Sequence, residues 1–178
     1  MRLAQLSNQI EQSKDTPVGG NPAGDVTVVE FFDYRCGYCK RVFPALLAAV
    51  KSDGKVRLVY KEFPILGPES VVASRAALAV FHTKPEKYEA YHEALMASKG
   101  GLSEARLLQI AKEIGLDPAA VKKAMADPRV DGEIHRNMAL AEQLNIRGTP
   151  AFVIGKELVP GAIELDAFKK LIKAARAG

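Results

Sequence analysis

The sequence has 178 residues, of which 48% are hydrophobic and 26% charged, and its formal net charge is +4. These values are ordinary for a soluble globular chain that buries a sizeable core, and they exclude a disordered chain. Lysine and arginine alternate with aspartate and glutamate, and no basic stripe with interleaved aromatic residues occurs. Nucleic acid is therefore not an expected partner.

The N-terminus offers neither a membrane-spanning run nor a secretory signal. No apolar run approaches the roughly 18 residues that a membrane helix needs, and the first residues lack the apolar region of a signal peptide. Two explanations stay open at this point. The chain is either cytosolic or an exported protein whose signal peptide is absent from this sequence.

Residues 1–15 predict a short polar helix with Leu3, Leu6 and Ile10 on one side. So short a seam is marginal as an isolated helix, so it is either a tail, frayed or packed on the body, or the end of an oligomerisation segment. Residues 16–25 are dense in turn-forming residues and predict a linker. The chain then divides into an N-terminal segment, residues 1–24, and a main domain, residues 25–178.

The main domain opens with a strand–helix–strand pattern. Residues 26–32 are almost entirely β-branched or aromatic, which is typical of a central strand covered on both faces. Residues 40–50 predict an amphipathic helix that Pro44 should kink. Residues 56–63 predict the second strand, and the crossover should be right-handed.

A helical block of about residues 66–146 interrupts the strands. Its predicted helices are residues 71–82, residues 87–98, a helix opening near residue 103, a helix opening at 117–118, and residues 131–144. Strand character returns at residues 151–154 and 158–160, which predict a hairpin, and an amphipathic helix closes the chain at residues 165–175. The order β-α-β, helical insertion, β-β-α predicts an α/β fold.

The two cysteines of the chain, Cys36 and Cys39, stand where the first strand ends and a helix begins. The free N–H groups and the dipole of a helix N-terminus stabilise a thiolate at Cys36, and the thiolate is the form that attacks a disulfide. Cys39 lies one turn further, close enough to resolve a mixed disulfide. The hypothesis is that Cys36 is the exposed nucleophile and Cys39 the buried resolving thiol.

Among the alternative roles of this cysteine pair, zinc binding and a structural disulfide have little support, whereas copper binding stays open. Zinc would need two further ligands, and the three histidines form no close pair. A structural disulfide that closes so small a loop stabilises little. A two-thiolate site for Cu(I) is chemically sensible, and it remains an alternative to redox catalysis.

Two further features of the sequence support a redox role for the cysteines. Glu30 interrupts the apolar strand, and a buried carboxylate is costly unless it titrates or is paired. Glu30 lies either at an edge position exposed to water or beneath the cysteines. We expect the second, with Glu30 as a proton acceptor for Cys39 and Lys61 on the neighbouring strand as its partner. Thr149 and Pro150 stand where the helical block rejoins the sheet.

These motifs together resemble a known family. The segments that carry the resemblance are Glu-Phe-Phe-Asp-Tyr-Arg-Cys-Gly-Tyr-Cys and, after the helical insertion, Gly-Thr-Pro-Ala-Phe. They resemble the DsbA-like thioredoxin-fold oxidoreductases of bacterial envelopes, from about residue 25 to the C-terminus. The resemblance implies that Cys36 is the nucleophile, Cys39 the resolving cysteine and Glu30 the buried acid. It also implies that Pro150 is a cis-proline beside the cysteines and that Thr149 tunes the pair.

The sequence differs from the strongest oxidases of that family. Those have Pro-His between the cysteines and Val before the cis-proline, whereas this chain has Gly37-Tyr38 and Thr149-Pro150. This combination is similar to that of the disulfide isomerase DsbC and of the ScsC group linked to copper tolerance. Loss of the imidazole removes one stabiliser of the thiolate, so the oxidising power should be smaller. Gly37, Tyr38, Thr149 and Pro150 are the candidate substrate-binding residues, and no metal or cofactor is expected.

The expected function is disulfide formation or isomerisation in secreted or envelope proteins. The alternatives are a Cu(I)-binding or copper-tolerance module and a thioredoxin-like reductase. By the same resemblance, the expected partners are protein thiols and disulfides and a membrane redox protein that recharges the pair. The expected location is the periplasm or another extracytoplasmic site, and residues 1–15 are a possible homo-oligomer contact.

Overall fold

The computed structural model describes residues 2–11 and 13–178. The strands are β1 (Val18–Gly20), β2 (Val26–Phe32), β3 (Val56–Glu62), β4 (Ala151–Ile154) and β5 (Glu157–Pro160). The helices are α1 (Arg2–Glu11), α2 (Gly37–Asp53), α3 (Pro68–Thr83), α4 (Tyr88–Ala97), α5 (Glu104–Glu113), α6 (Pro118–Ala124), α7 (Pro128–Gln143) and α8 (Leu165–Ala177), with a 3₁₀ turn at Pro85–Lys87.

The strands form one mixed sheet in the order β1-β3-β2-β4-β5. β2 and β3 are parallel, as the predicted strand–helix–strand unit requires, whereas the pairings of β1 with β3, β2 with β4 and β4 with β5 are antiparallel. The α/β prediction with a helical insertion is confirmed. β2 lies at the centre of the sheet, so the segment that follows it is held firmly.

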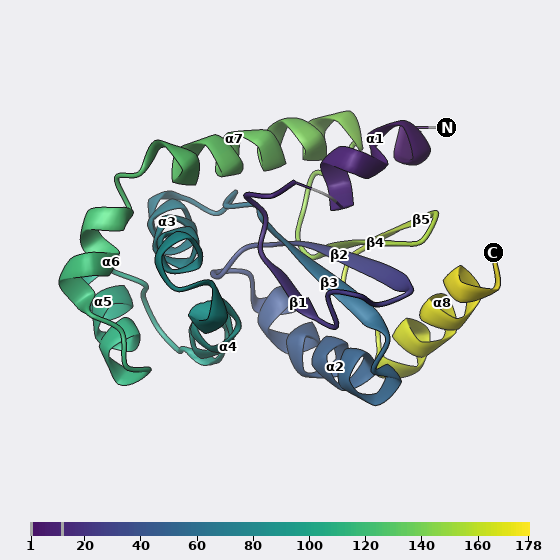
Figure 1. The fold of residues 1–178 in the computed structure, drawn as a ribbon, viewed down its shortest axis with the longest axis horizontal. Helices are drawn as coiled ribbons and strands as arrows, with labels where there is room; N and C mark the ends of the chain where they lie inside the picture. The colour runs from purple at the N-terminus through teal and green to yellow at the C-terminus, as the bar shows by residue number, and fades with distance from the viewer. Residues whose placement is uncertain (1, 12) are drawn as a thin grey trace.

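Helices cover both faces of the sheet (Figure 1). α2 and α8 lie against one face, α1 and α7 lie over the other, and α3 to α6 form a block beside the sheet. The beginning of α1 and the end of α8 lie at the same end of the molecule, away from that helical block.

Residues that alternate along β2 therefore enter two separate cores. Val26, Val28 and Phe32 belong to the core beneath α2 and α8, whereas Val29 and Phe31 belong to the core beneath α1 and α7. This alternation explains why the strand is apolar at nearly every position. It also decides which polar side chains of the sheet can meet.

The turn-rich segment after α1 contains a strand that the sequence did not predict. Val18–Gly20 pairs with β3 and covers its outer edge. Three residues with two glycines carry no strand pattern, so only tertiary pairing makes this segment extended. The division of the chain at residue 24 stays a prediction, but the structure places strands from both sides of it in one sheet.

The apolar side of α1 packs against the body of the protein. Ile10 is only 1% exposed, and Leu3 and Leu6 pack against the same core. These are the side chains of the predicted seam, so an oligomer contact through them would have to displace intramolecular packing. Oligomerisation through residues 1–15 stays a prediction, and part of that range, residues 1 and 12, lies outside the described residues.

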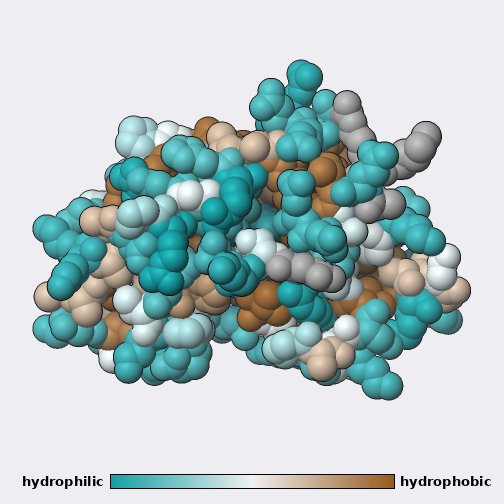
Figure 2. All heavy atoms as spheres, turned by 45° about the horizontal axis from the view of Figure 1, so that its top comes forward, coloured by the Kyte–Doolittle hydropathy of each residue, from teal (hydrophilic) through white to brown (hydrophobic). Residues whose placement is uncertain are grey.

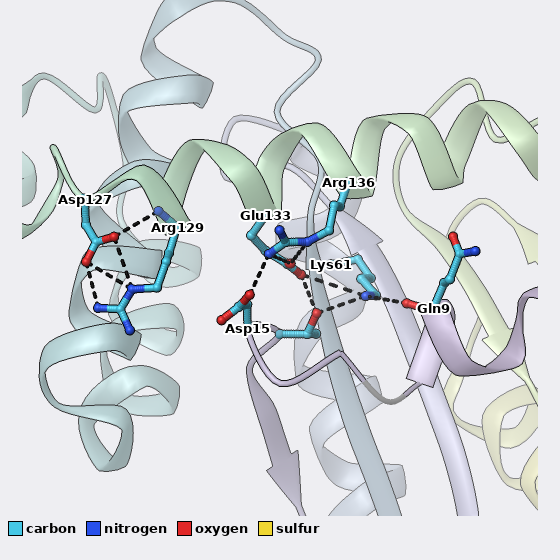
Figure 3. Close-up of polar contacts among 8 residues, drawn as sticks. Gln9, Asp15, Lys61, Asp127, Arg129, Glu133 and Arg136 are labelled. Atoms are coloured by element: carbon cyan, nitrogen blue, oxygen red, sulfur yellow. Dashed lines mark hydrogen bonds and ion pairs between the residues drawn. The ribbon is translucent and has the colours of Figure 1, made fainter.

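A buried polar cluster holds this N-terminal segment in place (Figure 3). Lys61 Nζ donates to the carbonyl oxygen of Gln9 at 3.1 Å and to Thr16 Oγ1 at 3.0 Å, and it lies 3.9 Å from Glu133 Oε1. The Thr16 hydroxyl donates to Glu133 in turn, and Arg136 bridges Glu133 and Asp15. α1, β3 and α7 are thereby joined by one network.

The face of the molecule seen in Figure 2 is mainly hydrophilic. Figure 2 shows polar residues over most of one face, with hydrophobic residues visible in separate small areas between them. Among the described residues, no helix is both long enough and apolar enough to cross a bilayer.

Candidate active site

Cys36 is the N-cap residue of α2, as the sequence predicts. Its Sγ accepts a hydrogen bond from the Cys39 backbone N–H at 3.3 Å, and its thiol donates to the carbonyl oxygen of Thr149 at 3.3 Å. The side chain is less open than expected, because Cys36 is only 6% exposed. Cys39 is fully buried at 0%, so Cys36 is the more accessible of the two thiols.

The surroundings of Cys36 favour its thiolate. A hydrogen bond from the Cys39 side chain lowers the pKa of Cys36 to about 6. Thr149 and the backbone N–H groups of Tyr38 and Cys39 add to this shift, and burial opposes it. The pKa of Cys39 is raised by its contact with Cys36, by burial and by the nearby Glu30. The two thiols therefore differ in acidity in the direction that the nucleophile–resolver hypothesis requires.

Glu30 lies in the sheet on the side covered by α2, fully buried, and burial raises its pKa to about 8. Within the described part of the chain, neither of its carboxylate oxygens has a hydrogen-bond partner. An unpartnered buried carboxyl is held neutral by its desolvation. Glu30 can therefore exchange a proton near neutral pH.

Lys61 is not the partner of Glu30, and this expectation is wrong. Glu30 pairs with Tyr60 across the β2–β3 ladder, whereas Lys61 pairs with Phe31. Because neighbouring residues of a strand point to opposite faces, Glu30 and Lys61 lie on opposite sides of the sheet. Lys61 belongs instead to the Glu133 cluster beneath α1 and α7.

The remaining predicted site residues surround Cys36. The Thr149–Pro150 peptide bond is cis, and Thr149 contacts the Cys36 thiol through its carbonyl oxygen. Tyr38 is 59% exposed, and the Arg41 guanidinium lies 5.0 Å from the centre of its ring. A Cβ atom added to Gly37 would meet nothing within 4 Å, so the space beside the cysteines is open there.

A groove follows the loop that carries Thr149 and Pro150. This "proline groove" has a volume of about 510 Å³, and its lining residues are Leu144, Asn145, Ile146, Arg147, Gly148, Thr149, Pro150, Ala151, Leu158, Pro160 and Gly161. Leu158 is partly exposed there. A shallow, mainly apolar groove beside a nucleophile is suited to an extended chain.

Sequence reasoning missed the role of Asp33, which fixes the loop before Cys36. Its buried carboxylate accepts hydrogen bonds from the backbone N–H groups of Arg35, Ile65 and Leu66 and from the Ser70 hydroxyl, at 2.8 to 3.0 Å. The Asp33 carbonyl oxygen also accepts from the Cys36 N–H at 3.0 Å. An Asp just after an apolar strand was the available signal, since such residues bind nearby backbone N–H groups.

A second buried carboxylate, Glu62, was also missed. It accepts hydrogen bonds from the hydroxyls of Tyr34, Tyr88 and Ser74, which come from the active-site loop, α4 and α3. Tyr34 also lies 2.8 Å from Nδ1 of His92, and burial lowers the pKa of this histidine to about 3. These hydrogen bonds join the segment before Cys36 to the helical insertion through hydroxyl groups, one carboxyl group and one imidazole.

No cluster of three or more histidine, cysteine or acidic side chains is placed to share a metal ion within the described residues. The two sulfur atoms of Cys36 and Cys39 are the soft donors that the site offers. What the arrangement provides is an acidic thiol, a less acidic thiol and a buried proton-exchanging carboxyl.

Comparison with known proteins assigns the fold to a family. A model of the DsbA-like thioredoxin domain matches residues 27–173. The chain belongs to the DsbA-like thioredoxin family. The resemblance inferred from the cysteine and proline motifs is confirmed.

Solved structures of DsbA-like proteins superpose closely. A thioredoxin-like oxidoreductase from Silicibacter pomeroyi is 45% identical with a TM-score of 0.92, covering 96% of this chain and 98% of that one. The catalytic domain of Proteus mirabilis ScsC is 30% identical with a TM-score of 0.91, covering 99% and 98%.

The chain also matches part of a longer curated protein. The Na(+)/H(+) antiporter NhaA 3 of Salinispora tropica is 28% identical over 89% of this chain, and the match covers 24% of the antiporter. The chain thus spans about a quarter of the length of this curated relative.

Proposed function

We propose that the protein exchanges disulfides with extracytoplasmic protein substrates through Cys36 and Cys39, as an oxidase or isomerase. The observation that carries this is the asymmetry of the pair. The more accessible Cys36 has a lowered pKa at the start of α2, and the fully buried Cys39 has a raised pKa beside Glu30.

Oxidation of a substrate follows from this asymmetry in two steps. A substrate thiolate attacks Cys36 Sγ of the Cys36–Cys39 disulfide, so a mixed disulfide forms and Cys39 leaves as a thiolate. A second substrate thiolate then attacks the substrate sulfur of the mixed disulfide, which releases the oxidised substrate and the Cys36 thiolate. Two electrons pass to the protein, and a disulfide-bearing or quinone-linked membrane partner must remove them.

Glu30 supplies the proton that Cys39 needs. The Cys39 thiolate is unfavourable because the thiol is buried beside an acidic group, so it takes the proton of neutral Glu30 as it leaves. In the reverse direction, Glu30 accepts the proton of Cys39 when this thiol attacks a mixed disulfide. This role rests on the burial of Glu30 and its influence on the pKa of Cys39.

Substrate binds beside Thr149 and Pro150. An extended substrate chain that places a cysteine on Cys36 meets the Thr149 backbone on one side, and Gly37 and Tyr38 line the other. The open space at Gly37 and the exposed ring of Tyr38 fit this use.

The test uses single-cysteine variants with reduced and scrambled forms of a multi-disulfide protein. We expect Cys39→Ser to accumulate a mixed disulfide with substrate and Cys36→Ser to form none. Recovery of scrambled substrate without added oxidant assigns isomerase activity, and activity confined to fully reduced substrate assigns oxidase activity. Tight stoichiometric Cu(I) binding with negligible exchange would replace the proposal by the copper alternative, and reduction of substrate disulfides alone would replace it by the reductase alternative.

A further inference from the structure

The proline groove carries a single charged side chain, that of Arg147. The other lining residues are apolar, glycine, threonine or asparagine. Arg147 is exposed, and the structure gives its side chain no hydrogen bond or ion pair with any described residue. The groove is therefore neutral except for one uncompensated positive charge.

The other cations close to the cysteines are already engaged. Arg35 forms an ion pair with Glu69 at 2.6 Å, and Arg41 lies over the Tyr38 ring. Lys40 donates to the carbonyl oxygens of Leu95 and Ser98 at the end of α4. None of these three is as free to meet a substrate charge as Arg147.

The position of Arg147 puts it within reach of a bound substrate chain. Thr149, whose carbonyl oxygen lies 3.3 Å from Cys36 Sγ, is two residues further along the chain. Two extended residues span about 7 Å, and an arginine side chain covers a similar length. A substrate residue within about three positions of the reacting cysteine can therefore contact the guanidinium.

We propose that Arg147 is a specificity-determining residue that favours substrate segments with an acidic side chain close to the reacting cysteine. This rests on the proposed exchange with protein substrates. A planar guanidinium binds a carboxylate through two parallel hydrogen bonds. Because the contact is partly open to water, its effect on selectivity is modest and falls with salt.

The test compares peptides of one sequence with a single cysteine and glutamate, glutamine or lysine two residues away. For each peptide, the rate constant for reduction of the Cys36–Cys39 disulfide is measured. This value is divided by the rate constant of the same peptide with the small disulfide 2-hydroxyethyl disulfide. This division is needed because the neighbouring charge changes the pKa of the peptide thiol itself. For the wild type we expect the glutamate peptide to exceed the lysine peptide by about two- to five-fold.

The variants decide the assignment. Arg147→Gln should bring the ratio of the glutamate-peptide rate to the lysine-peptide rate near one, and Arg147→Glu should invert it. Lys170→Glu should leave this ratio unchanged, because Lys170 is exposed on α8 and the substitution makes the same charge change elsewhere. A ratio that Arg147→Gln leaves unchanged, or a wild-type ratio near one, would overturn this inference alone. Reaction of the wild type with 2-hydroxyethyl disulfide but with no peptide would overturn the proposed function as well.

Discussion

At the scale of single residues, thiol–disulfide chemistry depends on the hydrogen bonds that the sulfur atom of Cys36 receives. Cys36 receives the Cys39 N–H and further hydrogen bonds at the start of α2, while Cys39, one turn away, is enclosed. Both thiols have the same intrinsic acidity, so the difference between them is created by position. The hydrogen bond from the Cys39 side chain has the largest influence on the pKa of Cys36.

Cys39→Ala should therefore raise the pKa of Cys36 from about 6 toward the ordinary thiol value of about 8.5. The variant loses the side-chain hydrogen bond but keeps the backbone donors, so we expect a rise of at least about one unit. Ultraviolet absorbance of the thiolate against pH measures it. An unchanged transition would mean that the backbone donors alone set the acidity of Cys36.

Glu30→Gln tests the buried carboxyl through the pH dependence of stability. Burial raises the pKa of Glu30 from 4.5 to about 8, so between these values the native state holds a proton that the unfolded state has lost. Stability from this group is present below pH 4.5 and falls as pH rises toward 8. Relative to the wild type, the reduced variant should therefore gain free energy of unfolding with pH, by up to about 4 kcal/mol at pH 8.

Urea unfolding of both reduced proteins at several values between pH 5 and pH 8 measures this difference. Glu62, whose pKa burial also raises to about 8, contributes to the slope of both proteins, so the difference between the two curves is the quantity that reports on Glu30. If the free energies of unfolding of the two proteins changed with pH in parallel, Glu30 would not be neutral in the folded protein.

At the scale of elements, the Lys61 network connects α1, β3 and α7. The Lys61 and Glu133 side chains are 2% and 1% exposed. Removal of one member of a buried pair leaves the other charge without compensation. The network therefore adds to the apolar packing that makes α1 dependent on residues far along the chain.

Glu133→Ala should lower the free energy of unfolding by about 3 kcal/mol. Arg129→Ala is the matched control, because its ion pair with Asp127, the N-cap residue of the same helix, is open to solvent, and its loss should cost far less than that of Glu133. Urea denaturation gives both values, and amide hydrogen exchange should report opening of α1 in the first variant only. Equal losses of unfolding free energy in the two variants would show that the buried pair contributes no more to stability than the exposed pair.

At the scale of the whole molecule, the acidity of Cys36 limits the redox potential. Its pKa of about 6 lies between the values of about 7 for thioredoxin and about 3.5 for DsbA. A more stable thiolate stabilises the reduced protein and makes its disulfide more oxidising. We therefore expect a potential between about −270 and −120 mV by equilibration with glutathione, and a value at or below −270 mV would favour a reductase.

The sequence predicted the parts of the molecule that obey local rules. The apolar strand β2, the cap at Cys36 and the order of strands and helices follow from periodicity and from the position of the cysteines. β1 was missed because its three residues become a strand only by pairing with β3. Helix ends shifted by a few residues, as at α2, which begins at Gly37 rather than at residue 40.

The candidate site was predicted where one motif carried it and missed where distant segments meet. Cys36, Cys39 and Thr149 lie together as expected. The predicted pairing of Glu30 with Lys61 was wrong because the two residues lie on neighbouring strands but on opposite faces of the sheet. The contacts of Glu62 join segments far apart in the sequence, and no local pattern reports them. For Asp33 the only local signal was its position just after an apolar strand.

The arrangement of the chain ends has a consequence for tethering. α1 begins and α8 ends at the same end of the molecule, whereas Cys36 lies where β2 meets α2, toward the helical insertion (Figure 1). A neighbouring module attached at either end would therefore be anchored away from the sulfur atoms. Such a tether would limit how far the domain travels and leave the mouth of its site unobstructed.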